Sequence, residues 1–167
     1  MGLTFVVGTP SDVFSPEFAA AVDAELRKRF ALADGDEPYH SEELDAGGWM
    51  ELQLRATSLL GRAPQLAMEA YQAVYVPAAF EGIQHVAVAN AADPLQVGSL
   101  PALIEELREL ASRAELPTDD LELMKLGAHY LEDEDPTRDL DVQTYVQLML
   151  SAKQASARGQ ALWILVS

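Results

Sequence analysis

Residues 99–114, SLPALIEELRELASRA, form the stretch with the clearest pattern in this 167-residue chain. Its apolar side chains recur every three or four positions, which predicts a helix with one buried stripe. Ser99 is a favoured residue type at a helix N-terminus, and it follows Gly98. The opposite face is charged, with Glu105, Glu106, Arg108, Glu109 and Arg113. We therefore expect the helix to cover a core on one side and to face water on the other.

The same periodicity predicts further helices on both sides of this stretch. They span 15–30, 49–60, 119–131 and 139–158, with a short helical segment at 64–70. The segment 49–60 also alternates like a strand, but its residues are strong helix formers and Gly61 can end a helix there. The segment 119–131 is apolar around most of its circumference, which predicts a buried helix.

Short stretches on either side of these helices have the composition of β-strands. They are 3–8, 72–77, 84–90 and the terminal ALWILVS, and the second and third could pair as a hairpin. The first is almost continuously apolar, which indicates a strand covered on both faces. Together the elements predict an α+β fold, with a mixed α/β arrangement as the alternative. We expect a single domain over 1–167, with a small central sheet of about four strands and about five or six helices.

The chain contains no cysteine, which excludes disulfides, thiol catalysis and zinc sites with cysteine ligands. Its apolar runs are far too short to span a bilayer, and the N-terminus lacks the pattern of a secretion signal. We expect a cytoplasmic protein that does not bind membranes. The sequence contains no phosphate-loop, dinucleotide-binding or serine-hydrolase signature, and we predict no cofactor and no catalytic residue.

The formal net charge is −16 at pH 7, and the sequence pI is about 4.3. This charge opposes binding to nucleic acids and anionic membranes, and it favours a neutral or basic protein partner. Acidity also keeps proteins soluble, so solvation alone is the alternative explanation. The many apolar segments are compatible with a homodimer, which is a default expectation for soluble proteins.

Acidic residues are concentrated in two segments that interrupt the helical pattern. The segment 33–48 has no lysine or arginine and is broken by glycine and proline, which predicts an exposed loop. The segment 132–141 separates two predicted helices. If the two segments adjoin, they form one negative patch that can neutralise a basic protein, as in an inhibitor or immunity-type protein. The predicted partner-binding residues are Asp36, Glu37, Glu42, Glu43, Asp45 and Trp49, with the tryptophan as an exposed anchor.

A metal-dependent hydrolase is the alternative function. His129, Glu132 and Asp133 have i, i+3 and i+4 spacing, which places imidazole and carboxylate groups on one side of a helix. His40 lies in the first acidic segment and could complete such a site. The sequence has no His-Glu-x-x-His or calcium-loop motif, and acids beside a proline at a helix end are also ordinary solvated residues. A small-molecule pocket between sheet and helices is a third hypothesis, with no polar motif to support it.

Overall fold

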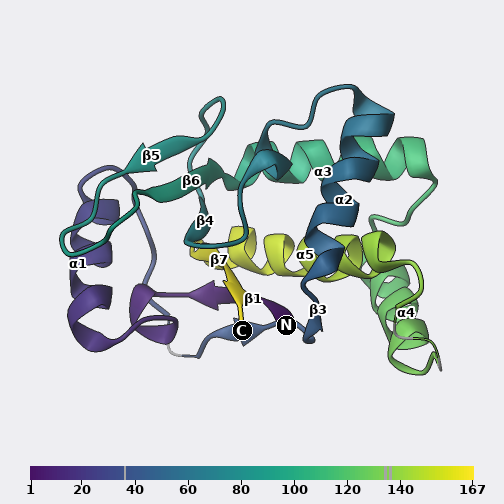
Figure 1. The fold of residues 1–167 in the computed structure, drawn as a ribbon, viewed down its shortest axis with the longest axis horizontal. Helices are drawn as coiled ribbons and strands as arrows, with labels where there is room; N and C mark the ends of the chain where they lie inside the picture. Colours follow the sequence, from purple (N-terminus) through teal and green to yellow (C-terminus); the bar gives the residue numbers. More distant parts are fainter. Residues whose placement is uncertain (36, 134, 136) are drawn as a thin grey trace.

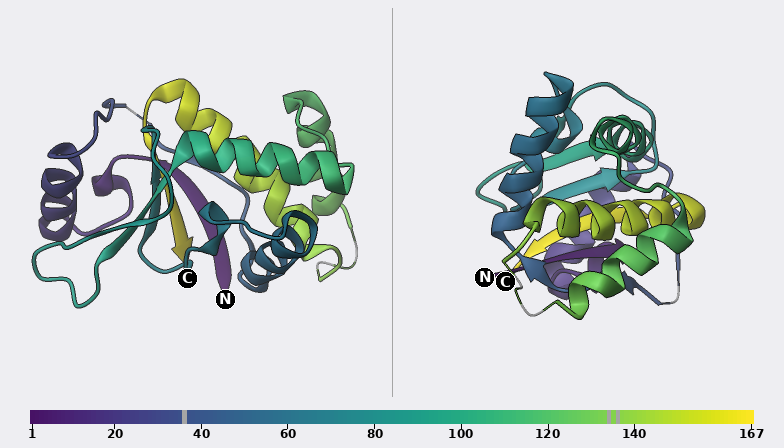
Figure 2. Two further views of the ribbon diagram at one scale, coloured as in Figure 1. Left: turned by 90° about the horizontal axis from the view of Figure 1, so that it is seen from above. Right: turned by 90° about the vertical axis from the view of Figure 1, so that its right-hand side faces the viewer.

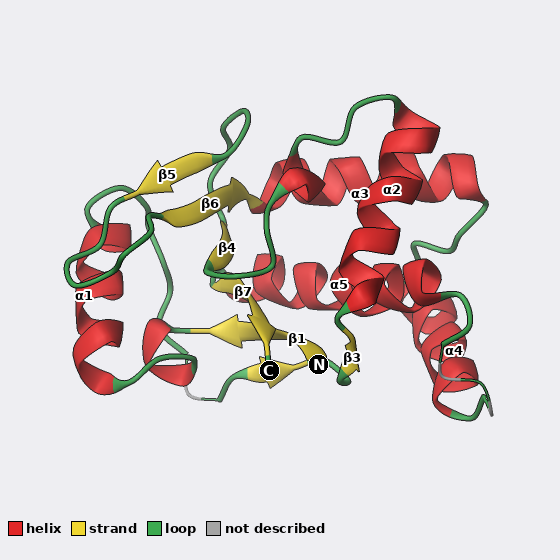
Figure 3. Cartoon of the chain, viewed as in Figure 1, coloured by secondary structure: helices red, strands yellow, loops and turns green. Residues whose placement is uncertain are grey.

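The structure, a computed structural model, describes residues 1–35, 37–133, 135 and 137–167. These residues form a seven-stranded open sheet in which the strand order is β2-β1-β7-β4-β6-β5 and β3 also pairs with β1 (Figure 3). The strands are β1 (Gly2–Gly8), β2 (Tyr39–His40), β3 (Leu44–Asp45), β4 (Ala73–Val76), β5 (Gln84–Val86), β6 (Leu95–Ser99) and β7 (Ala161–Val166). The neighbours β4 and β6 are parallel, and the other neighbouring strands are antiparallel.

The fold is mixed helix and sheet, as predicted, but the sheet is larger than the expected four strands. Three strands lie outside the predicted stretches, and each has a physical reason for being missed. The strands β2 and β3 have two residues each, which is too short to show an alternating pattern. The strand β6 ends at Ser99, the residue that also caps the following helix, so no break in the sequence separates the two elements.

Five α-helices accompany the sheet in the described ranges. They are α1 (Pro16–Arg27), α2 (Gly47–Leu60), α3 (Leu100–Ala114), α4 (Asp120–Leu131) and α5 (Leu140–Arg158), with short 3-10 turns at Pro10–Asp12 and Gln65–Ala67. Each α-helix coincides with a predicted one, so the helical interpretation of 49–60 is confirmed. None of the helices in this part of the chain is both long enough and apolar enough to cross a membrane.

Different helices cover the two faces of the sheet (Figures 1 and 2), and each face carries one hydrophobic cluster. Helix α1 covers one face, and α2, α3 and α5 gather on the other. Along β1, Phe5 belongs to the larger cluster and the adjacent Val6 to the smaller one, because successive side chains of a strand point to opposite faces. Both faces of β1 are therefore covered, which confirms the expectation from its apolar sequence.

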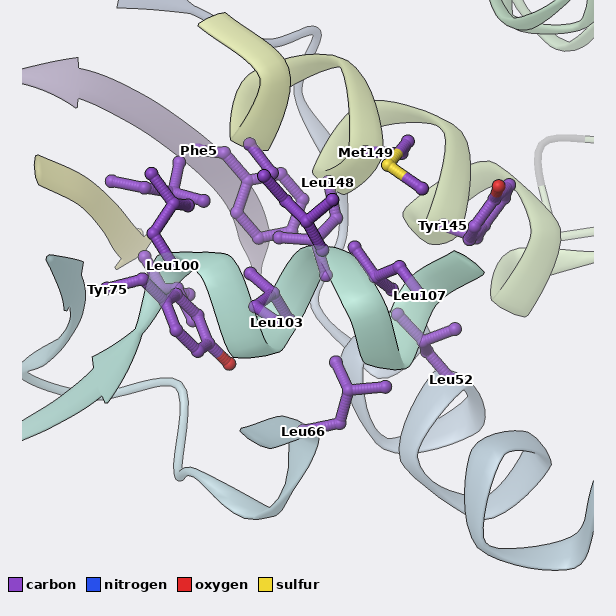
Figure 4. Packing of buried hydrophobic residues seen from close by; sticks show 14 of the residues in the cluster. Phe5, Leu52, Leu66, Tyr75, Leu100, Leu103, Leu107, Tyr145, Leu148 and Met149 are labelled. Atoms are coloured by element: carbon purple, nitrogen blue, oxygen red, sulfur yellow. The ribbon is translucent and has the colours of Figure 1, made fainter. Parts of the chain in front are cut away.

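Helix α3 supplies the centre of the larger cluster (Figure 4). Leu100, Leu103 and Leu107 are each at most 1% exposed and face side chains from the sheet, α2 and α5. Burying each of these leucines stabilises the fold by about 1.5–3 kcal/mol relative to leaving it in water. The Ser99 hydroxyl accepts a hydrogen bond from the backbone N–H of Ala102 at 3.3 Å, which confirms the predicted cap.

The strands predicted at 72–77 and 84–90 do not form a hairpin. Strand β6 lies between them, and its Val97 is in register with Val74 of β4 on one side and with Gln84 of β5 on the other. The buried valines of β4 and β6 occupy the interior of the sheet, whereas Gln84 and His85 are exposed and suit a short edge strand.

Candidate functional site

The first acidic segment is an irregular sheet edge for part of its length, and not a free loop. The strands β2 and β3 both pair with β1, in the registers Val6↔His40 and Leu3↔Leu44. Between them, the backbone N–H of Ser41 donates to the Phe5 carbonyl at 2.9 Å. The next two residues, Glu42 and Glu43, are exposed, and we call this pair the acidic bulge.

The predicted partner-binding carboxylates within the described residues lie at the surface, with different contacts. Glu37 is exposed, and its carbonyl oxygen accepts a hydrogen bond from Arg158 Nη1 at 2.8 Å. Asp45 is exposed and accepts a hydrogen bond from the backbone N–H of Gly47 at 2.7 Å, at the start of α2. Its negative charge is favourable there because the helix N-terminus carries a partial positive charge. Asp36 lies outside the described residues.

Trp49 is buried, and the expectation of an exposed anchor is wrong. The side chain is 4% exposed, its Nε1 donates a hydrogen bond to the Met68 carbonyl at 2.8 Å, and its ring centroid lies 6.1 Å from that of Phe5. The cause is helical periodicity, since Trp49, Leu52 and Ala56 fall on the one face of α2 that packs into the core.

The two acidic segments approach each other where α2 and α5 begin. A β-carbon placed on Gly48 would lie 3.1 Å from the carbonyl oxygen of Leu140 and would collide with the Thr144 hydroxyl, so the helix ends are in close contact. Nearby, Arg55 Nη1 lies 4.0 Å from a carboxylate oxygen of Asp141. The end of the first acidic segment, at Gly48, therefore lies against the end of the second, at Leu140.

Gln147 of α5 lies between the acidic bulge and helix α4. Its Oε1 accepts a hydrogen bond from the backbone N–H of Glu42 at 3.3 Å. Its Nε2 faces α4, since a β-carbon on Gly127 would lie 3.3 Å from this nitrogen. Gln147 is 8% exposed, so the carboxamide fills the space between the two elements. The bulge and α4 are thus neighbours across one side chain.

Helix α4 is far more exposed than its sequence suggested. Only Leu123 and Gly127 are buried among its residues, whereas Leu121, Met124 and Leu131 are 59%, 60% and 63% exposed. These three, with the exposed Ala128, recur at spacings of three and four and form one line along the helix, which we call the α4 stripe. The prediction of a buried helix was wrong because α4 packs mainly on α5, leaving this line uncovered by the described residues.

The described part of the chain contains no group of three or more histidine, aspartate and glutamate residues that could hold a metal ion. His129, Glu132 and Asp133 are thus not assembled as a ligand set, and His40 is exposed on β2. Near the end of α4 the acids instead organise the loop. Asp135 accepts hydrogen bonds from the Thr137 hydroxyl at 2.7 Å and its N–H at 3.1 Å, and these bonds lower the pKa of the Asp135 carboxyl.

No family model, curated protein or solved structure matches this chain. The geometry of its own residues is therefore the basis for any functional conclusion. Sequence reasoning identified the exposed carboxylates but missed the α4 stripe as a candidate surface. The signal was present, because apolar side chains encircle this helix, yet only the tertiary structure shows which of them face solvent.

Proposed function

We propose that the chain is a non-enzymatic protein-interaction domain that binds a basic protein through the α4 stripe and the acidic bulge. The observation that carries the proposal is the position of Gln147, whose carboxamide lies between the Glu42 backbone in the acidic bulge and Gly127 of α4, the helix that carries the exposed apolar line. Clustered exposed apolar side chains rimmed by polar residues are characteristic of interaction sites. Figure 1 shows α4 and the β3 edge along the same margin of the molecule.

Charge determines which partner suits this surface. Asp120 and Glu122 are exposed near the start of α4 and Glu132 near its end, while Lys125 is the one lysine or arginine within the helix. A partner with apolar anchors surrounded by lysine and arginine would bury the stripe and offset the acids. A second copy of this chain is disfavoured, because two such surfaces would bring like charges together and the net charge is −16.

The apolar residues and the carboxylates have different roles in this proposal. Each large stripe side chain that becomes fully covered contributes up to about 1.5–3 kcal/mol, less the cost of association. The carboxylates chiefly accelerate encounter and select basic partners, and salt weakens this effect. A cytoplasmic inhibitor or immunity-type protein that masks the basic surface of an effector is the form of the proposal that fits the acidic composition best.

Selection from a random peptide library tests the proposal without a known partner. The immobilised wild-type protein is the bait, and a Leu121→Ser, Met124→Ser, Leu131→Ser variant is used in parallel. We expect wild-type protein to enrich peptides with lysine or arginine interspersed with apolar residues, and the variant to lose this enrichment. All three residues are at least 59% exposed, so the variant should fold normally.

A matched control uses two exposed apolar residues on another helix. Met50 and Leu54 of α2 are 64% and 62% exposed, and the Met50→Ser, Leu54→Ser variant should enrich the same peptides as the wild type. Enrichment of acidic or uncharged peptides would overturn the proposal. So would equal enrichment by the wild type and the α4 variant, or no enrichment by the wild type.

A further inference from the structure

An aromatic cavity of about 270 Å³ lies near α1, where β7 runs beyond the end of β4. Its wall includes Phe14, Phe18 and Trp163, together with residues 70–73 and 164–166. Phe14 makes edge contacts with both other rings, at centroid distances of 5.4 Å to Trp163 and 4.9 Å to Phe18. Trp163 Nε1 donates to the Gly8 carbonyl at 3.1 Å, so its polar atom is already paired and the ring offers the cavity an apolar surface.

The main chain of β7 offers hydrogen-bonding groups beside this cavity. Gly2 and Ser167 exchange two backbone hydrogen bonds, of 3.1 Å and 3.0 Å. Because such pairs alternate along an antiparallel ladder, the N–H and C=O of Val166 point away from β1. The strand on that other side, β4, pairs with β7 only between Ala73 and Tyr75.

A turn before β4 prevents that strand from continuing along β7. Gln72 has φ of 53°, in the left-handed region, and the preceding Tyr71 is 67% exposed. The position opposite Val166 is therefore not filled by a strand from the described part of the chain. Val166 is itself 37% exposed, so part of this residue is accessible to solvent.

We propose that this site binds an extended peptide segment, whose backbone pairs with Val166 and whose aromatic or large apolar side chain enters the cavity. Strand addition supplies the main-chain hydrogen bonds, and a pocket beside the strand supplies the side-chain preference. A free aromatic molecule would use the cavity but not the ladder groups, which distinguishes the two kinds of ligand. The site is separate from the α4 stripe, and the proposal does not depend on that surface.

Amide chemical shifts test the proposal, with the capped tripeptide Ac-Ala-Phe-Ala-NH₂ as the probe. We expect saturable shifts of the Val166 amide and of the Trp163 indole, and none with Ac-Ala-Ala-Ala-NH₂. Methylating the backbone nitrogens of the probe should weaken binding by about tenfold, because it removes the ladder donors. Equal binding of the methylated peptide would show that only the ring is recognised and would overturn the proposal.

A cavity-filling variant provides the second arm. Ala70 is half-buried and lines the cavity, so Ala70→Phe should abolish binding. Ala79 is exposed and does not line this cavity, so Ala79→Phe should bind the probe as the wild type does. Absence of any saturable shift in the wild type, or unchanged binding to a folded Ala70→Phe protein, would contradict the proposal. Retained indole and amide dispersion in the spectrum establishes that each variant is folded.

Discussion

The Ser41 side-chain oxygen accepts a hydrogen bond from the backbone N–H of Phe5 at 2.9 Å, where a strand neighbour would ordinarily supply a main-chain carbonyl. The same hydroxyl donates to the carbonyl of Glu42, also at 2.9 Å. One buried serine therefore satisfies the ladder of β1 while the chain turns outward into the acidic bulge. This arrangement fixes the backbone of the acidic bulge, where the N–H of Glu42 donates to Gln147.

Replacing this serine should destabilise the fold. Ser41→Ala leaves the Phe5 N–H buried without its acceptor, which should lower the free energy of unfolding by about 1–3 kcal/mol. Chemical denaturation measures the change. The exposed Ser58→Ala in α2 is the control and should alter stability by no more than about 0.5 kcal/mol. Equal stabilities for the two variants would show that the Ser41 bond is not needed.

Close contact between α2 and α5 makes Gly48 intolerant of a side chain. A methyl group at this position would collide with the Thr144 hydroxyl, so Gly48→Ala should destabilise the protein by about 1–3 kcal/mol. The double variant Gly48→Ala, Thr144→Ala should recover part of that loss, because the nearest obstructing atom is gone. Thermal or chemical unfolding of the wild type, the two single variants and the double variant gives the coupling energy between the two positions. Additive effects would contradict the predicted contact.

Glu106 should give the fold a measurable dependence on pH. Its carboxylate accepts hydrogen bonds from the backbone N–H groups of Gln65 and Leu66, at 3.0 Å and 2.8 Å. Burial nevertheless raises the pKa of Glu106 above its ordinary value of 4.5. The folded protein thus takes up this proton at higher pH than the unfolded chain does. The contribution of Glu106 to stability increases as pH falls through the raised pKa of the folded state. It levels off once the pH is below the pKa that Glu106 has in the unfolded chain.

Unfolding curves of the wild type and Glu106→Gln test this dependence. The variant should be less stable by about 1–3 kcal/mol, since one backbone N–H loses its acceptor. The difference between the two proteins should be larger near pH 4.5 than at neutral pH, because only the wild type gains from protonation at this site. A difference that shrinks as pH falls would contradict the raised pKa.

The acidic bulge should control the salt dependence of binding. The selected basic peptides should associate more slowly with the double variant Glu42→Gln, Glu43→Gln than with the wild type. Added salt should also reduce the association rate by a smaller factor for this variant than for the wild type. Stopped-flow association rates at two ionic strengths measure this. The control Glu51→Gln, Glu105→Gln removes the same charge from exposed positions on α2 and α3. If the association rates of the two variants depend equally on ionic strength, the acidic bulge does not control the salt dependence of binding.

The sequence predicts local elements of this protein well, because local rules determine them. Local periodicity and capping rules account for the buried apolar face of α3, for its Ser99 cap and for the continuous apolar run of β1, each of which depends on only a few residues. The strand order does not follow from such rules. The strand β6 lies between β4 and β5 because this order buries side chains across the whole sheet. A short window of sequence contains no information about such long-range burial.

The candidate site was predictable in part for the same reason. The exposure of Glu42 and Glu43 followed from their acidic, glycine-broken segment. The sequence showed that the helix over 119–131 is apolar around most of its circumference, but it could not show that Leu121 and Met124 face solvent. The link through Gln147 joins residues 105 positions apart, so only the tertiary fold reveals it.

The most direct test of the proposed function is the affinity of one library-selected basic peptide for two variants, measured by isothermal titration calorimetry. The account predicts that Leu121→Ser, Met124→Ser, Leu131→Ser weakens binding by at least about a hundredfold, or roughly 2.7 kcal/mol, whereas Met50→Ser, Leu54→Ser matches the wild type. Equal affinity for both variants, with both folded, would contradict the claim that the α4 stripe is the binding surface.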